Sequence, residues 1–348
     1  MRRLASGGRG QPRGAVPRWA FGLWLLLFES GYLLLVSASD GWPLVRAHWP
    51  IALTMLFGSY LAGSTPVGGG SVAFPILVLL LGEPAALGRS FAFAIQALGM
   101  GSAVLYLLAT GRPLAWGVLR WALLGSLLAT PVGVTWLAPR VPELGVKLVY
   151  AVVWASFGLI TLLRLRELAA QTGMQEPGPG GELAAGLLAG TIGGGVVASV
   201  AGVGADMLLY SVLVLLFRAD ARIAIPTAVS LMAFTSVVGV ATQALLATQD
   251  PSVPLLHPGV GGYWLAAAPV VVLGAPLGAL AVSAIPRTGT LALVALLCLG
   301  QLAWICAQAR LAPAGIAWVV AAVLALGGML QLLHAQGRRA SRASPRLL

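Results

Sequence analysis

Charged residues are scarce in this chain, and their scarcity excludes a soluble globular protein. Only 9% of its 348 residues are Asp, Glu, Lys or Arg, whereas 59% are apolar, and the mean hydropathy is +0.92. Soluble domains carry about 25% charged residues. Between positions 51 and 82 there is no charged residue. The composition therefore predicts one integral membrane unit rather than a string of soluble domains.

Histidine and cysteine are also rare, which argues against metal sites and disulfides. The three histidines lie at the ends of apolar stretches or in loops, and Cys298 and Cys306 are eight positions apart in one predicted helix. One straight helix keeps these thiols too far apart to bond to each other. Without a histidine inside an apolar stretch, haem or zinc ligation and a serine–histidine dyad are not expected. No cofactor is expected.

Long apolar stretches are what the chain has in abundance. A membrane helix needs roughly 20 apolar residues to cross a hydrocarbon core about 30 Å thick. The chain contains ten such stretches: 19–38, 51–81, 85–110, 114–138, 144–163, 183–217, 221–246, 263–285, 291–309 and 314–333. They predict an all-α polytopic membrane protein.

Two of these stretches belong to an internal repeat. Aligned with itself at one fixed offset and without a gap, the chain pairs Gly58 with Gly194, Gly68 with Gly204, 77–80 with 213–216, and Ala92 with Ala228. Glycine-broken apolar segments at corresponding positions of two halves are the best sequence indication of a transporter's binding site. The repeat predicts two homologous halves, each with a glycine-broken helix or hairpin, plus an extra N-terminal helix.

Length favours hairpins at the two broken stretches, 51–81 and 183–217. Both are much longer than the roughly 20 residues that one untilted crossing needs, and glycines divide each into two short pieces. Hairpins would leave three crossing stretches between the repeats. Because three is odd, the halves would be inverted, which suits alternating access. The positive-inside bias accepts either model: 15 basic residues inside against 6 outside for ten crossings, and 16 against 5 for eight.

The chain ends are basic, with five arginines before the first stretch and four after the last. This pattern predicts two cytoplasmic termini of a multi-pass protein in the cytoplasmic membrane, and no nucleic-acid partner. The first stretch is interpreted as an uncleaved helix rather than a signal peptide, because it is long, contains Glu29 and precedes many spans. The predicted layout is a tail (1–18), an extra helix and loop (19–50), a first transport repeat (51–170), a linker (171–182), a second repeat (183–335) and a tail (336–348).

The broken segments form the predicted binding site. Where a helix restarts, its first N–H groups are unpaired and its dipole is positive, which suits an anion. The predicted substrate-binding residues are Ser64, Thr65, Gly68, Gly69, Gly70 and Ser71 at the first break, Gly202 and Gly204 at the second, and Ser90, Gln96, Thr227 and Ser230 on the helices that follow. In the alternative interpretation, these glycines only permit close helix packing.

Three further residues carry separate predictions. Asp206 is the only acid deep inside a broken stretch, and a buried ionisable group in a membrane is a functional candidate. It either carries a proton or cation, which makes it the ion-coupling candidate, or caps the restarting helix. Arg89 either completes the site or extends to the headgroups. It is assigned a structural role, together with Pro75.

The first break resembles the sulfite exporter TauE/SafE family of membrane transporters. The family's halves open with a glycine-rich break followed by a Pro-x-Leu restart, matched here by Val-Gly-Gly-Gly-Ser-Val-Ala-Phe-Pro-Ile-Leu at 67–77. The stretch 224–230 loosely matches the small, hydroxyl-rich start of the family's next helix. The resemblance covers about 51–333 and implies transport of sulfite, organosulfonates or related organic acids. The second half departs from it, with Asp206 in place of a glycine and Ser211 in place of the proline.

The leading hypothesis is therefore a secondary transporter of small anions and not an enzyme. No nucleotide-binding motif is present, so an ion gradient must supply the energy, with H⁺ as the candidate coupling ion. A passive anion channel is the alternative. An intramembrane enzyme is less favoured: 202–206 resembles the Gly-x-Gly-Asp of membrane aspartyl proteases with one residue inserted, but the only other acid within a span is Glu29. Small anions and the lipid bilayer are the expected partners.

Overall fold

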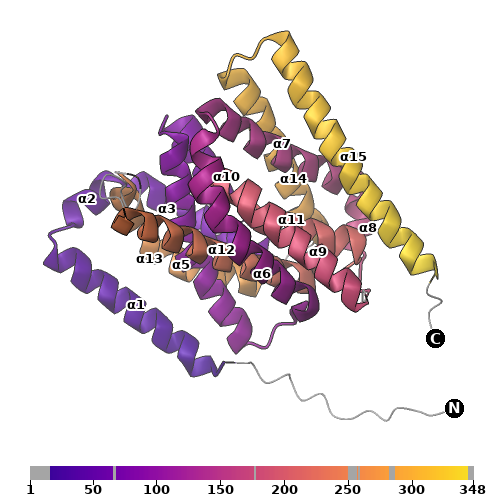
Figure 1. Cartoon of the computed structure of the whole chain (residues 1–348). Helices are drawn as coiled ribbons and strands as arrows, with labels where there is room; N and C mark the ends of the chain where they lie inside the picture. Colours follow the sequence, from indigo (N-terminus) through magenta and orange to yellow (C-terminus); the bar gives the residue numbers. More distant parts are fainter. Residues whose placement is uncertain are drawn as a thin grey trace.

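The structure is a computed structural model that describes residues 16–65, 68–175, 178–249, 257, 259–281 and 287–343. These residues form helices and no strand, and nine of the helices are long and apolar enough to cross a membrane (Figure 1). The nine are α1 (Arg18–Ala38), α5 (Ala85–Ala109), α6 (Trp116–Val132, extended by π and 3-10 turns to Arg140), α7 (Glu143–Leu163), α9 (Pro179–Ile192, extended to Ala201), α12 (Ala221–Gln249), α13 (Val260–Ala281), α14 (Arg287–Gln308) and α15 (Pro313–Ala343). The predicted all-α polytopic class is confirmed.

Prolines and glycines set many of the helix ends. Pro84 directly precedes α5 and Pro142 directly precedes α7, positions at which the missing N–H of proline costs nothing. After η1 (Ile76–Leu80) and after α5, Gly82 and Gly111 adopt positive φ angles of 71° and 66°, the conformation that commonly stops a helix.

The first broken segment turns back on itself. It consists of α3 (Trp49–Ser64), a turn at Gly68 with φ of +68°, and a return arm made of α4 (Gly70–Pro75) and the π-helix η1. Its two ends meet at Tyr263 on α13: the phenol donates to Glu83 Oε1 over 2.7 Å, and the His48 ring packs edge-on at 4.6 Å between centroids. A segment that begins and ends at one place is a hairpin.

The second broken segment has the same form. Its outward arm is α9, the π-helix η4 (Gly193–Ala198) and α10 (Ser199–Ala201), and its return arm is α11 (Ala205–Ser211) and the π-helix η5 (Val212–Leu216). Just before α9 the Gln175 amide donates to the Phe217 carbonyl (2.8 Å), and the Asp220 amide donates to the Gly173 carbonyl (2.6 Å). Both ends of this segment therefore also lie together.

The ends of the two return arms are built alike at corresponding positions of the repeat. Both arms finish as π-helix, and the same two backbone hydrogen bonds close each: Leu81 to Ile76 and Glu83 to Leu77 in the first, Phe217 to Val212 and Ala219 to Leu213 in the second. The repeat seen in the sequence is thus matched by local backbone geometry.

Each hairpin packs against a helix of the other predicted half. The helix α3 lies along α13, and α9 lies along α6, while α5 packs on α12 and α7 on α14 (Figure 1). Glycines permit these close approaches: a β-carbon at Gly63 would lie 1.8 Å from the Ala275 carbonyl oxygen, and one at Gly190 would lie 2.0 Å from that of Ala122. Small residues at helix contacts are the usual device of membrane proteins.

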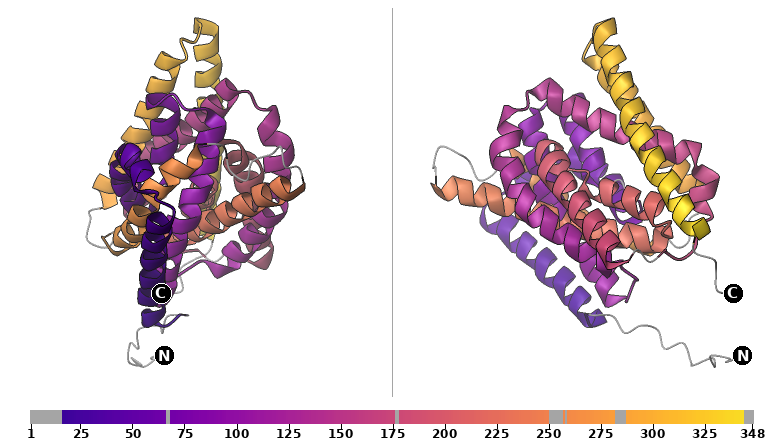
Figure 2. Two further views of the ribbon diagram at one scale, coloured as in Figure 1. Left: turned by 90° about the vertical axis from the view of Figure 1, so that its left-hand side faces the viewer. Right: turned by 45° about the vertical axis from the view of Figure 1, so that its right-hand side comes forward.

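The first and last helices flank this bundle. The extra helix α1 contacts α5 and α13, whereas α15 contacts α7 and η5 at the other side (Figure 2). α15 continues to Ala343 and so includes part of the predicted basic tail. Residues 1–15 of the other predicted tail lie outside the described residues. The domain boundaries stay predictions.

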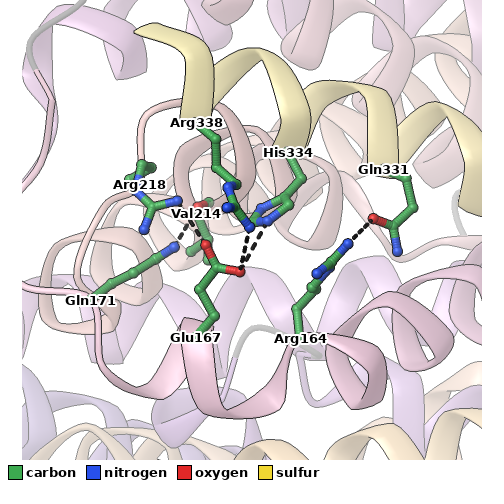
Figure 3. A network of polar contacts seen from close by, with 8 residues as sticks. All are labelled: Arg164, Glu167, Gln171, Val214, Arg218, Gln331, His334 and Arg338. Atoms are coloured by element: carbon green, nitrogen blue, oxygen red, sulfur yellow. Dashed lines mark hydrogen bonds and ion pairs between the residues drawn. The ribbon is translucent and has the colours of Figure 1, made fainter. Parts of the chain in front are cut away.

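An ion-pair network fixes α15 to the end of the second hairpin (Figure 3). Glu167, on the short helix α8 (Leu165–Ala169), accepts from Arg218 over 3.0 Å, and its other oxygen lies 3.1 Å from His334 Nε2 and 3.8 Å from Arg338. Burial alone would raise the pKa of Glu167. The hydrogen bond from Arg218 and the neighbouring positive charges outweigh it and bring that pKa below its usual value of 4.5.

Acid should loosen this network. Because the folded pKa of Glu167 lies below its unfolded value, the network's contribution is complete above about pH 4.5 and is lost as the pH falls through the folded pKa. We expect the Glu167→Gln variant in detergent to unfold more easily at pH 7, by about 1–2 kcal/mol, and to show a flatter dependence of melting temperature on pH. As the control, Glu143→Gln removes a more exposed pair with Lys147 and should change little. Equal pH profiles for wild type and Glu167→Gln would contradict this role.

Candidate functional site

The tips of the two hairpins touch inside the bundle. A β-carbon at Gly68 would lie 2.5 Å from Asp206 Oδ2, and one at Gly70 would lie 2.3 Å from the Val203 side chain. Gln96 of α5 lies between the two breaks, 2.7 Å from the β-carbon position of Gly70. Asp206 and Gln96 are only 1% and 2% exposed. The absence of a side chain at the two glycines is what lets the breaks meet.

One oxygen of the Asp206 carboxyl group accepts a hydrogen bond, and the other has no hydrogen-bond partner. Its Oδ1 accepts the Met207 amide (2.9 Å) in the first turn of α11, where the helix dipole favours a negative charge. Its Oδ2 is buried with no hydrogen-bond partner, and no ion pair of the described residues includes it. A buried carboxylate without a counter-charge costs several kcal/mol. The group therefore either holds a proton or needs a cation beside it.

Gln96 offers a second unsatisfied acceptor at the same point. Its Nε2 donates to the carbonyls of Gly202 (2.8 Å) and Ala92 (2.9 Å), which fixes the orientation of the amide. Its Oε1 is buried without a partner and lies 3.3 Å from the β-carbon position of Gly68. Two buried acceptors that face one place and lack partners can take up a proton or a cation.

A small cavity adjoins this point on the side of the first hairpin. It is lined by residues of α3, α5 and α13 and by the first break, among them Ser59, Gly69, Gln96, Gly99 and Val271. Gln96 therefore contacts a hollow on one side and the second break on the other.

Pro75 explains how the first return arm is held. Proline has no N–H, so the Ser71 carbonyl lacks its partner one turn further on. Tyr150 of α7 and Gln301 of α14 supply the donors instead, with Tyr150 Oη at 2.8 Å and Gln301 Nε2 at 3.2 Å. In the second half Ser211 stands in place of the proline, and its hydroxyl donates to the Met207 carbonyl (2.8 Å).

Aromatic rings of α7 connect the two breaks. Phe74 stacks on Tyr150 at 5.0 Å between centroids, and Tyr150 stacks on Trp154 at 4.3 Å. Trp154 in turn lies 2.7 Å from the β-carbon position of Gly204. Sequence reasoning missed Tyr150, Trp154 and Gln301. The one available indication was Pro75, because a proline inside a helix requires a donor from elsewhere.

The predicted hydroxyl residues do not all gather at the breaks. Ser71 lies in the first turn of α4, beside the break. The described hydrogen bonds of Ser64, Thr65 and Ser230 run to carbonyls one turn earlier in their own helices, those of Tyr60, Leu61 and Pro226. Thr227 donates to Ile223 and accepts the Ala115 amide, and Ser90 accepts from Gln243. Six of the predicted residues therefore gather at the meeting point: Gly68, Gly69, Gly70, Gln96, Gly202 and Asp206. Gly204 instead faces Trp154. Binding of substrate by any of them stays a prediction.

Comparison with known proteins identifies the family. The profile of the family described as Sulfite exporter TauE/SafE matches residues 51–305, which include both hairpins. A search of curated proteins and a search of solved structures each found no significant match. Since the match covers most of the chain, including both glycine breaks, Gln96, Asp206 and Gln301, the protein belongs to the sulfite exporter TauE/SafE family of membrane transporters.

Proposed function

We propose that the protein is a secondary transporter that moves sulfite, organosulfonates or related small organic anions across the cytoplasmic membrane, and that Asp206 carries the coupling proton. One observation supports this most directly. The two glycine breaks meet at a buried carboxyl oxygen and a buried amide oxygen, neither of which has a partner. Helix breaks of this kind are where transporters place substrate and coupling ion.

A proton suits the pair of oxygens better than a metal cation. A protonated Asp206 donates from Oδ2 to an acceptor such as Gln96 Oε1. One hydrogen bond then gives a partner to each of these two buried oxygens. A hard metal cation takes about six oxygen ligands, and the side chains at this point supply two. Among the described residues there is no group of three or more His, Cys, Asp or Glu that could hold a metal ion.

The positions of the hairpin ends support an inverted repeat. The first hairpin begins and ends near Tyr263, while the second begins and ends near Glu167 and Arg218. Three membrane helices, α5, α6 and α7, separate the hairpins, so their ends would lie at opposite membrane surfaces. The surface at Glu167 holds Arg164, Arg166, Arg218, Arg338 and Arg339 and is therefore assigned to the cytoplasm. The eight remaining crossings then place both termini there.

Reconstitution tests this proposal. Purified protein in liposomes is expected to accumulate labelled sulfite, a sulfonate or a carboxylate when a pH gradient is imposed, and to lose that accumulation when a protonophore removes the gradient. Protein-free liposomes are the control. Uptake that proceeds equally with and without the gradient would identify a passive channel, and no uptake of any of the three anions would overturn the proposed substrate class.

A further inference from the structure

Arg89 is a cation without a counter-charge. It lies in the second turn of α5, its Nε is buried with no hydrogen-bond partner, and no ion pair of the described residues includes it. The acid nearest in sequence, Glu83, accepts a hydrogen bond from Tyr263 instead. A half-buried guanidinium inside a membrane protein is costly unless an anion offsets it.

Arg89 also lies on the face of α5 that holds the second break. A β-carbon at Gly202 would lie 2.7 Å from the Arg89 carbonyl oxygen and 3.0 Å from the side chain of Ala92, and Gln96 donates to the Gly202 carbonyl. Arg89 and Gln96 are seven positions apart, which is two helical turns, or about 10 Å along the axis. The tip of the second hairpin is therefore held against α5 between the backbone of Arg89 and the side-chain amide of Gln96.

We propose that Arg89 binds the oxyanion group of the transported solute. Side chains on a helix lean toward its N-terminus, so the guanidinium extends from the second turn of α5, away from Gln96, toward the surface where Glu83 and His48 meet Tyr263. A guanidinium donates two parallel hydrogen bonds to an oxyanion, whereas the ammonium group of a lysine cannot. This inference rests on the proposed function and assigns Arg89 a role in binding rather than in structure.

Sulfite uptake by variants in neutral phosphatidylcholine liposomes tests the inference. Arg89→Gln is expected to raise the KM for sulfite roughly ten- to hundredfold, the cost of a lost charge-assisted pair. Arg89→Lys keeps the positive charge but cannot donate two parallel hydrogen bonds, so we expect a smaller rise in the KM for sulfite. Arg310→Gln is the matched control, because Arg310 is an exposed arginine next to the end of α14, whose Gln308 binds the Leu79 carbonyl of the first hairpin. A wild-type KM in Arg89→Gln would overturn the inference.

Two further measurements separate the possible outcomes. The same oxyanion chemistry occurs in lipid headgroups, so uptake is repeated in liposomes with phosphatidylglycerol. If Arg89→Gln changes only the response to this lipid and not the KM for sulfite, the arginine serves the membrane and the inference fails.

In detergent, sulfite should raise the melting temperature of wild type and of Arg310→Gln but not of Arg89→Gln. This binding test remains decisive if wild type transports nothing, a result that would overturn the proposed function alone. If Arg89→Gln does not fold, an unchanged KM in Arg89→Lys overturns the inference.

Discussion

Replacing Asp206 with Asn is expected to abolish anion uptake driven by a pH gradient while leaving the protein folded. The Asn oxygen can still accept the Met207 amide, as Asp206 Oδ1 does. The Asn amide adds a donor where Asp206 Oδ2 now has no partner, beside the orphan oxygen of Gln96. The variant therefore imitates the protonated state permanently. It should fold as well as wild type and have no proton to exchange.

Two assays on Asp206→Asn distinguish coupling from binding. Uptake driven by a pH gradient should be lost, whereas exchange of labelled for unlabelled anion should continue, because exchange does not require the proton to leave. Asp40→Asn is the control: Asp40 is exposed, and its φ of 49° suits Asn as well as Asp. Gradient-driven uptake at the wild-type rate in Asp206→Asn would refute the coupling role, and loss of both activities would show that Asp206 serves binding or structure instead.

Replacing Gly68 with Ala is expected to reduce gradient-driven uptake by at least about tenfold. The added carbon would come within 2.5 Å of Asp206 Oδ2, closer than non-bonded atoms approach. The carboxyl group must move, which would disturb the proposed pair of Asp206 with Gln96. The φ of +68° at this residue adds about 1 kcal/mol of backbone strain for any residue with a side chain.

Gly82→Ala separates the two effects. Gly82 has nearly the same φ, +71°, but a β-carbon there meets nothing within 4 Å. Gly82→Ala should lose thermal stability from backbone strain alone and keep transport, whereas Gly68→Ala should lose at least as much stability and also lose transport. Both are measured as melting temperature in detergent and initial uptake rate in liposomes. An equal loss of transport in the two variants would show that strain rather than contact with Asp206 is responsible.

The hairpins and their glycines could be predicted from the sequence, because the repeat and the excess length of the broken stretches constrain the chain locally. The meeting of the two breaks was inferred from the same pattern. The partners of the Ser71 carbonyl could not be found this way, since Tyr150 and Gln301 come from helices 79 and 230 positions away. Only the packing of α7 and α14 brings them beside α4.

The two halves differ in the side chains around their breaks. Thr227 and Ser230 follow the second break as Ser90 and Gln96 follow the first. In the structure the hydroxyls of Thr227 and Ser230 donate to carbonyls of their own helix, an option that threonine and serine have in a helix, and their role in binding stays a prediction. In the alignment of the two repeats, Gln96 falls on Met232 and Asp206 falls on Gly70. The repeat retains the backbone breaks but not the polar groups beside them.

The β-carbon position of Gly68 faces both Gln96 and Asp206, one residue from each predicted half. Two identical copies would hold the same residue types at matching positions, so duplication alone does not give one acid opposite one amide. The halves have diverged at these positions, where Gln96 falls on Met232 and Asp206 on Gly70. The two halves are thereby complementary rather than redundant, and the proposed proton site needs a residue from each.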